Sequence, residues 1–394
     1  MAQELSAAER IALRGLLGAV AKEPVGHLSS EWEEAAWAVP RHRFLPERIY
    51  LGDDLEPCDR TETPETWLQA AYADAPVVTQ VNDGHDPGDA DRWPSSSASE
   101  PSIVFRMLDM LDLADGHRVL EIGTGTGWNA GLLAHRLGGE NVTTVEWDPA
   151  LADAGAACLR RLGLGPAVIT GDGALGHPSG GPYDRVEATC SVRSVPRAWV
   201  EQTKPGGIIL VPWESPWFCY GLLRLEAGAH GDASGVFAPH SAFMLMRHQR
   251  TDLRIFRDVV RDGHRPEESW TVLPPQAVAG RDWSAQFALG LRLRDVWRTW
   301  QDDPGVDGVA SRLWVATTDA RSWAAVDRDG RSEDRFTVWQ YGPRRLWNEV
   351  EAAYAWWFRQ GRPGPGRYGL TTTPEGERVW LDHPDRPLPG PTAG

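Results

Sequence analysis

The chain has 394 residues and a formal net charge of −15 at pH 7, and its length predicts two or three domains. A pI of about 5.2 argues against general binding to nucleic acids or anionic membranes, and no apolar stretch is long enough to span a membrane. Four cysteines lie far apart without a Cys-x-x-Cys pair and the eleven histidines are scattered, so we expect reduced thiols, a cytoplasmic location and no bound metal.

The first hundred residues contain little periodic sequence. Helices are predicted at residues 5–22, about 29–38 and about 64–72, and a short strand at 77–81. Residues 82–100 show no periodicity, and their serine-rich end favours disorder when taken alone. Their position directly before a helix at 101–113 favours a lid instead, so we expect a long loop there. Ser99 would then lie near the N-terminus of that helix, where the backbone favours an anion.

The rest of the chain is organised around residues 118–129, Arg-Val-Leu-Glu-Ile-Gly-Thr-Gly-Thr-Gly-Trp-Asn. Apolar residues predict a buried strand over 118–122, and an apolar helical run follows the glycines. The glycines allow the backbone to turn sharply and to pass close to a bound molecule. Strand, glycine turn and helix are typical of a nucleotide-type cofactor site, although an ordinary βα turn would explain the loop taken alone.

Acidic residues accompany three successive predicted strands. Glu121 precedes the glycines, Glu146 ends the strand 141–146, and Asp172 lies between two glycines after the strand 167–170. A carboxylate one βα unit downstream of a glycine loop can accept hydrogen bonds from ribose hydroxyls, and Asp172 can reach an adenine amino group. Such a set of acids suits a neutral ribose and a cationic centre, and it suits a pyrophosphate poorly.

These three motifs, at 121–127, 145–148 and 171–173, resemble the S-adenosyl-L-methionine site of class I methyltransferases. Two further stretches make the resemblance narrower, to the protein-L-isoaspartate O-methyltransferase family. Residues 39–46 match that family's Val-Pro-Arg-His-x-Phe-x-Pro signature, and residues 97–101 match its Thr-x-Ser-x-Pro signature. The resemblance covers roughly residues 1–213. Ser97 replaces the usual Thr, Glu100 the usual Gln, and Trp128 the usual Tyr.

The resemblance implies an α/β class I (Rossmann-like) methyltransferase fold with S-adenosyl-L-methionine as cofactor. The core strands are expected at 118–122, 141–146, 167–170, 185–190 and 207–212. The residues expected to hold the cofactor are Glu121, Gly123, Thr124, Gly125, Thr126, Gly127, Asn129, Glu146, Trp147, Gly171, Asp172 and Gly173. The residues expected on the substrate side are Arg41, His42, Val81, Cys190 and Ser191. Glu187, a charge inside a strand that should be buried on both faces, has no explanation from the sequence.

A carboxylate that accepts a methyl group is already ionised at neutral pH, so the reaction needs no general base. It needs alignment, partial desolvation and donors that hold the oxygen that does not react. Ser99 is the first candidate for such a catalytic hydroxyl and Ser97 the second, while Arg41 or His42 could neutralise the charge of the acceptor.

The sequence after residue 213 changes to the alternation of strands. Strands are expected at 218–225, 243–247, 313–318, 323–327 and 336–341, a helix at about 343–360, and a closing hairpin at 367–372 and 378–381. Thirteen of the 20 tryptophans follow residue 206, and we interpret most of them as core residues of an additional α+β domain. The predicted organisation is residues 1–100, N-terminal helices and a substrate-side loop; 101–213, the cofactor-binding core; 214–385, the C-terminal domain; and 386–394, a disordered tail.

The function left by these observations is carboxyl methylation of a protein or peptide bearing aspartate or isoaspartate. The additional domain and the departures at residues 100 and 128 favour the branch that tailors ribosomally made peptides, where the ester closes to an aspartimide. Repair of isoaspartate in damaged proteins is the first alternative. A non-catalytic peptide-binding protein and a nicotinamide dehydrogenase are weaker ones, because the acids and the glycine spacing fit a methyl donor. No nucleic-acid or membrane partner is expected, and the oligomeric state is not predicted.

Overall fold

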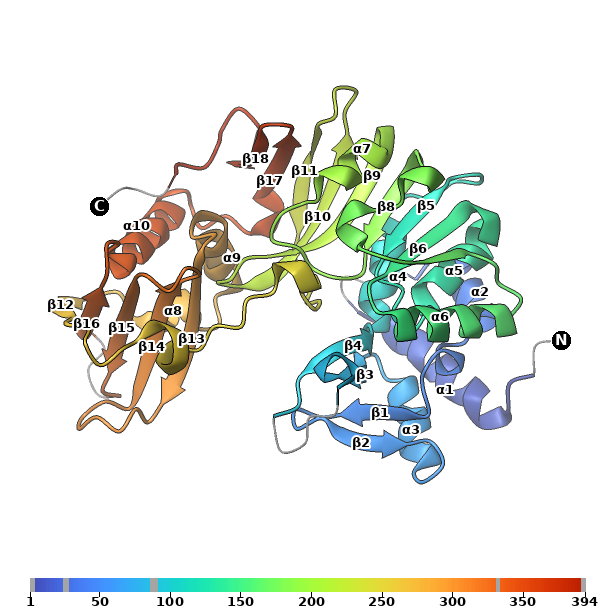
Figure 1. The fold of residues 1–394 in the computed structure, drawn as a ribbon, viewed down its shortest axis with the longest axis horizontal. Coiled ribbons are helices and arrows are strands. Elements are labelled where there is room, and N and C mark those ends of the chain that lie inside the picture. Colours follow the sequence, from blue (N-terminus) through green and yellow to red (C-terminus); the bar gives the residue numbers. More distant parts are fainter. Residues whose placement is uncertain (1–3, 24–27, 86–90, 331–333, 391–394) are drawn as a thin grey trace. The chain divides into compact units, whose positions relative to one another are not determined.

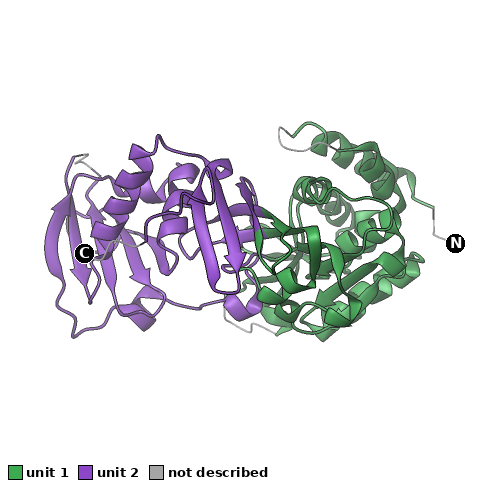
Figure 2. Ribbon diagram, turned by 90° about the horizontal axis from the view of Figure 1, so that it is seen from above, with its two compact units in different colours: residues 1–190, 195–211, 224–233 green, residues 191–194, 212–223, 234–394 purple. Residues whose placement is uncertain are grey.

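The computed structural model describes residues 4–23, 28–85, 91–330 and 334–390. Two compact units are present (Figure 2): unit 1 comprises residues 1–190, 195–211 and 224–233, and unit 2 comprises residues 191–194, 212–223 and 234–394. The division therefore differs from the expected single boundary near residue 213. The boundary expected between residues 100 and 101 lies inside unit 1.

Unit 1 contains a parallel sheet whose strands follow the order β9-β8-β5-β6-β7 (Figure 1). These strands are β5 (Val119–Ile122), β6 (Val142–Glu146), β7 (Ala167–Thr170), β8 (Tyr183–Ala188) and β9 (Thr203–Glu214), the last of which continues into unit 2. The helices between them are α4 (Pro101–Met110), α5 (Trp128–Leu137), α6 (Pro149–Arg161) and α7 (Arg197–Gln202). All five predicted core strands, and with them the α/β class I fold, are confirmed.

The N-terminal part of unit 1 adds two helices, α1 (Ala7–Val20) and α2 (Ser30–Ala38), and a small antiparallel sheet of order β2-β1-β3-β4. The strands of this sheet are β1 (Arg48–Leu51), β2 (Glu56–Asp59), β3 (Val77–Val81) and β4 (Pro94–Ala98), and the helix α3 (Pro64–Ala71) lies between β2 and β3 in the chain. The predicted loop over 82–100 is wrong at its end, because β4 pairs with β3 there and Ser97 lies opposite Val78. Serine carries no apolar signal, so the two-residue period of this strand was invisible in the sequence. Residues 86–90 of the predicted loop lie outside the described residues.

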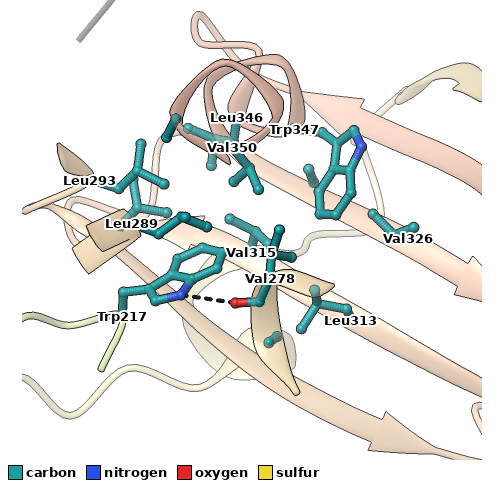
Figure 3. Packing of buried hydrophobic residues seen from close by; sticks show 14 of the residues in the cluster. Trp217, Val278, Leu289, Leu293, Leu313, Val315, Val326, Leu346, Trp347 and Val350 are labelled. Carbon is teal, nitrogen blue, oxygen red and sulfur yellow. Dashed lines mark hydrogen bonds between the residues drawn. The ribbon is translucent and has the colours of Figure 1, made fainter. Parts of the chain in front are cut away.

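Unit 2 is built on an antiparallel sheet of order β12-β16-β15-β14-β13. Its strands are β12 (Glu267–Thr271), β13 (Val296–Asp302), β14 (Ser311–Thr317), β15 (Trp323–Arg328) and β16 (Phe336–Tyr341), and its helices are α8 (Pro275–Ala279), α9 (Trp283–Arg292) and α10 (Leu346–Arg359). Figure 3 shows one sheet face packed against these helices, with Val315 between Val278 and the α10 residue Val350. The core role expected for tryptophan is confirmed for Trp347, which is 1% exposed.

The other strands of unit 2 are neighbours in the order β18-β17-β11-β10. They are β10 (Cys219–Ala227), β11 (Ala233–Ala238), β17 (Tyr368–Thr373) and β18 (Gly376–Leu381); β10 and β11 also contribute residues to unit 1. The strand expected at 243–247 is wrong, because only an isolated bridge forms there, between Leu245 and Ser191. The disorder expected from residue 386 is wrong as far as residue 390: the N–H of Leu388 donates to the Val379 carbonyl at 2.9 Å. Residues 391–394 lie outside the described residues.

Among the described residues, the helices are too short or too polar to cross a lipid bilayer.

Candidate active site

The glycine loop between β5 and α5 has a backbone that only glycine adopts easily. Gly123, Gly125 and Gly127 have φ values of +102°, +51° and +87°. A Cβ on Gly127 would also lie 3.2 Å from the carbonyl oxygen of Gly155 in α6, so helix and loop approach closely. The hydroxyl of Thr189, a residue that the sequence analysis did not select, donates to the Gly123 carbonyl at 2.6 Å. The close approach of α6 and the hydrogen bond from Thr189 therefore fix the conformation of the loop.

Glu146 ends β6 beside this loop and is only 8% exposed. One carboxylate oxygen accepts the N–H of Gly125 at 2.8 Å, and the other accepts the N–H of Asp148 at 3.1 Å. Asp148 in turn caps α6 by accepting the N–H of Ala150 at 2.9 Å. Trp147, between the two acids, leaves 46% of its side chain exposed. An indole with this exposure can stack on a flat ring bound next to Glu146.

The end of β7 reaches the same place. The N–H of Gly171 donates to the Glu146 carbonyl at 2.8 Å. Asp172 is half-buried, and its Oδ1 accepts the N–H of Ala174 at 2.9 Å. The Trp199 indole N–H donates to the Gly173 carbonyl at 2.8 Å and so stabilises the turn after β7. The acids predicted at the ends of β6 and β7 are thus brought together at the carboxyl edge of the sheet, where α/β folds bind their ligands.

These residues fit S-adenosyl-L-methionine. The Glu146 and Asp172 carboxylates are acceptors for the hydroxyl and amino donors of an adenosine, and the negative charge suits a sulfonium. The space over Gly125 is left open by the missing side chain. A Cβ there would face the Ser96 hydroxyl and the Ser97 carbonyl, both at 3.8 Å, so β4 passes within van der Waals distance of the loop.

Glu121 differs from its predicted position at the cofactor. Its carboxyl group is 0% exposed and lies under the loop, where it contacts Asn129 at 2.8 Å and the Thr144 hydroxyl. We therefore correct its role from direct contact to support of the loop from below, whereas the cofactor contact of the half-buried Asn129 stays a prediction. The sequence placed both residues correctly in the motif but could not show the direction of their side chains.

Ser97 and Ser99 are partly exposed, while their neighbours Ser95 and Ser96 are 6% exposed each. The buried Ser95 hydroxyl donates to Gln80 Oε1 at 2.8 Å, and Gln80 Nε2 donates to Asp148 at 2.9 Å. Hydrogen bonds through Gln80 therefore connect β4 to Asp148, which contacts Glu146. Gln80 is a second residue that the sequence analysis missed, because nothing in its surroundings marked it.

Arg41 does not face an acceptor. It is 1% exposed, and its two terminal nitrogens donate to five backbone carbonyls, those of Ala71, Ala73, Ala75, Ala98 and Ser99, at 2.9–3.2 Å. Burial lowers its pKa to about 10, so the side chain remains charged at neutral pH. The predicted contact of Arg41 with substrate is corrected: the buried guanidinium binds the carbonyl of Ala98, which ends β4, and that of Ser99, which follows it.

His42 is also a structural residue. It is 4% exposed; Nδ1 lies 2.5 Å from the Tyr72 hydroxyl and Nε2 lies 3.2 Å from Glu9. Burial lowers the pKa of His42 to about 4, against the opposing effect of Glu9. The imidazole is therefore neutral at pH 7, and the prediction that it neutralises the charge of an acceptor is corrected.

The remaining residues predicted on the substrate side, Ser191, Cys190 and Val81, have different surroundings. Ser191 is 0% exposed, and its hydroxyl oxygen lies 2.7 Å from Glu214 Oε2 and 2.8 Å from the carbonyl oxygen of Phe243. Its predicted place beside the substrate is corrected, because these partners occupy it. Cys190 is half-buried after the end of β8, and Val81 is 6% exposed at the end of β3. A substrate contact for these two stays a prediction.

Known proteins resemble the part of this chain that contains the candidate site. The sequence model of the family described as Protein-L-isoaspartate(D-aspartate) O-methyltransferase (PCMT) matches residues 51–218. A protein-L-isoaspartate O-methyltransferase of Methanosarcina mazei is 31% identical over 231 residues, which is 58% of this chain and 79% of that protein. Protein-L-isoaspartate O-methyltransferase 1 of Archaeoglobus fulgidus is 34% identical over 201 residues, which is 50% of this chain and 79% of the relative.

A solved structure titled protein-L-isoaspartate O-methyltransferase superimposes with a TM-score of 0.51 and 19% identity, and the match covers 95% of this chain and all of that one. At this identity the match supports the fold, which is that of a class I methyltransferase. The sequence matches carry the identification further. The chain belongs to the protein-L-isoaspartate O-methyltransferase family and is an S-adenosyl-L-methionine-dependent carboxyl methyltransferase.

The position of Arg41 gives a testable prediction. In Arg41→Lys, one ammonium cannot reach five carbonyls, and each buried carbonyl left without a donor costs about 1–3 kcal/mol. We expect the melting temperature to fall by at least about 4 °C. Arg48→Lys is the matched control, because the Arg48 side chain is 60% exposed and pairs with Asp59 at the surface. Equal melting temperatures for the two variants would contradict the structural role.

Proposed function

We propose that this chain transfers a methyl group to the free carboxylate of an isoaspartyl residue in a protein or peptide. Family membership supports the reaction and the acceptor class. The observation that carries the proposal is the course of β4: a Cβ at Gly125 would lie 3.8 Å from the Ser97 carbonyl oxygen, and the part-exposed Ser97 and Ser99 lie on this strand and directly after it. An acceptor held by these hydroxyls would lie next to a methyl donor held by the loop and Glu146.

In this proposal the loop residues 123–127 surround the cofactor, Glu146 and Asp172 accept hydrogen bonds from its adenosine, and Trp147 covers the base. When bound, S-adenosyl-L-methionine supplies an electrophilic methyl group that a carboxylate oxygen can take by in-line displacement. The protein does not have to move a proton, because the acceptor is already ionised at neutral pH. Its task is to align the acceptor and to keep it partly dry.

The serine hydroxyls perform that alignment. Ser97 lies on β4 and Ser99 directly follows the strand, and each part-exposed hydroxyl can donate to a carboxylate oxygen. Among the described residues, neither hydroxyl has a protein partner, in contrast to the buried Ser95. Arg41 holds the backbone of Ser99 by a 2.9 Å hydrogen bond to its carbonyl oxygen. The Ser99 hydroxyl itself remains available to the acceptor carboxylate.

The product ester has a good leaving group. When the nitrogen of the following peptide bond attacks the ester carbonyl, methanol leaves and a five-membered succinimide forms. Hydrolysis of this ring can return a normal aspartyl residue, which is the chemistry of repair. The enzyme does not have to catalyse this second step.

A second candidate is methylation of a normal aspartate in a modified ribosomal peptide. An open pocket in unit 2 is compatible with a bound peptide, and its lining does not distinguish aspartate from isoaspartate. It has a volume of about 320 Å³ and includes Phe256, Trp297, Trp300 and Trp314 in its lining, side chains suited to gripping a peptide. Two features of the sequence that favour this candidate, Trp128 and the C-terminal extension, have another explanation. Trp128 is a core residue, 4% exposed, whose indole donates to the Val39 carbonyl. The solved structure that matches 95% of this chain carries the isoaspartate name, so the C-terminal extension does not favour tailoring.

Mass spectrometry with three acceptors tests the proposal. The protein is incubated with S-adenosyl-L-methionine and an isoaspartyl peptide, the same peptide with aspartate, or a cyclised aspartate-containing precursor. We expect the gain of one methyl group, followed by loss of methanol, with the isoaspartyl peptide. Methylation of the cyclised precursor alone would replace this proposal by the second candidate, and no methylation of any acceptor would contradict both.

A second prediction concerns the hydroxyl of Ser99. In Ser99→Ala we expect kcat to fall about ten- to a hundredfold, since a hydrogen bond to a charged group contributes about 1.5–3 kcal/mol. The Kd for S-adenosylhomocysteine, measured by calorimetry, should stay within about twofold. Ser179→Ala is the control. Ser179 is exposed, and the carbonyl of its neighbour Gly180 accepts from Arg118 at the amino end of β5. Ser179 therefore lies at the end of the strand opposite to the glycine loop. Unchanged turnover in Ser99→Ala would remove this residue from the mechanism.

A further inference from the structure

Two acidic side chains lie side by side inside the central sheet. Glu121 on β5 and Glu187 on β8 are direct partners in the register of these parallel strands, and both are 0% exposed. A pair of carboxyl groups at this depth is costly unless it is neutralised and hydrogen-bonded. The methyl transfer described above does not use Glu187, so its presence requires another explanation.

Hydrogen bonds connect this pair to the glycine loop. The side-chain amide nitrogen of Asn129 lies 2.8 Å from an oxygen of Glu121 and 2.8 Å from an oxygen of Glu187. The Thr144 hydroxyl donates to the second oxygen of Glu121, and it lies 2.7 Å from the hydroxyl of Thr124. Thr124 belongs to the glycine loop, and Asn129 belongs to the first turn of α5 that follows it. The chain of contacts therefore runs from β8 to the loop.

The pair is protonated in part at neutral pH. Burial raises the pKa of Glu187 to about 8 and that of Glu121 to about 7, and the charge of Glu121 raises the pKa of Glu187 further. The groups that face Glu187 are Glu121 from β5, Asn129 from α5 and, across the register to β9, the apolar Leu210. Glu146 adds a further negative charge that acts on Glu121.

We propose that Glu187 is a positioning residue for the cofactor site, which acts through Asn129 on Glu121 and through Thr144 and Thr124 on the glycine loop. The inference rests on the cofactor site proposed above. The amide of Asn129 has two N–H groups and gives one to each carboxyl group, so Glu187 determines how the amide is turned. With Glu187 absent, that amide can rotate, and Glu121 loses a fixed donor beneath the loop.

The oxygen Oε1 of Glu187 is buried and has no hydrogen-bond partner among the described residues. A neutral carboxyl group tolerates this environment better than a carboxylate does. The state that positions Asn129 is therefore the protonated one, with the other oxygen as acceptor. Ionisation above the pKa of Glu187 would place two negative charges beside one amide.

Two substitutions of Glu187 separate positioning from simple packing. Glu187→Gln keeps the shape and the acceptor for Asn129 but cannot ionise, and Glu187→Leu removes the acceptor. At pH 7 we expect calorimetry with S-adenosylhomocysteine to give a Kd within about twofold of wild type for Glu187→Gln. We expect the Kd of Glu187→Leu to rise about three- to tenfold, the loss of one hydrogen bond in the network.

The melting temperature without cofactor supplies the second readout. In the unfolded chain Glu187 ionises near its ordinary pKa of 4.5, whereas in the folded protein it ionises near 8. Wild type therefore loses stability as the pH rises between these two values, and above pH 8 this loss stays constant. Glu187→Gln lacks this loss, so its melting temperature relative to wild type should rise by about 3 °C or more from pH 5 to pH 8. The exposed Glu140→Gln should show no such rise.

The outcomes distinguish this inference from the cofactor site itself. If Glu187→Leu binds S-adenosylhomocysteine as wild type does, and the melting curves of wild type and Glu187→Gln run parallel over pH 5–8, the positioning role is wrong. If Glu187→Leu does not fold, the Kd of Glu187→Gln still decides, because ionisation of Glu187 above pH 8 should weaken S-adenosylhomocysteine binding by wild type and leave that of Glu187→Gln unchanged; equal pH dependence of the two Kd values would overturn the positioning role. If wild type itself fails to bind S-adenosylhomocysteine, the cofactor site is wrong, and the result does not depend on Glu187.

Discussion

The hydrogen bond from the N–H of Gly125 to the buried carboxylate of Glu146 is the interaction on which the site depends. It fixes the glycine loop against the end of β6, in a conformation with φ of +51° that favours glycine. The same residue lies close to β4, because a Cβ at Gly125 would lie 3.8 Å from the Ser96 hydroxyl and from the Ser97 carbonyl oxygen. Gly125 is therefore the point at which the glycine loop and β4 are neighbours.

The other parts of unit 1 hold these two elements in place. Arg41 binds the end of β4 from inside, and Gln80 connects β4 to Asp148, the residue that caps α6 beside Glu146. From below, the carboxyl groups of Glu121 and Glu187 determine the orientation of Asn129. A reaction that needs alignment and no proton transfer benefits from such rigid support, since small displacements of the acceptor would cost rate. The polar residues under the site thus serve its geometry.

The sequence predicted the fold and the convergence of the glycine loop with the strand-end acids, but not the surroundings of Arg41 and His42, for physical reasons. Glycines and strand-end acids such as Glu146 carry their constraint in the residue type, because few other residues satisfy it. Arg41 and His42 are polar residues in a family signature, and only the structure shows that their partners are backbone carbonyls and Tyr72. Glu187 was visible as an unexplained charge, but its partner Asn129 lies 58 residues away in the chain.

The most direct test of the account is the affinity of Glu146→Gln for S-adenosylhomocysteine, measured by calorimetry beside wild type and the exposed control Glu140→Gln. We expect wild type and the control to bind equally. We expect the Kd of Glu146→Gln to rise about ten- to a hundredfold, because the carboxylate holds Gly125 and is the proposed acceptor for the ribose hydroxyls. Equal affinity of all three proteins would contradict the placement of the cofactor at the end of β6.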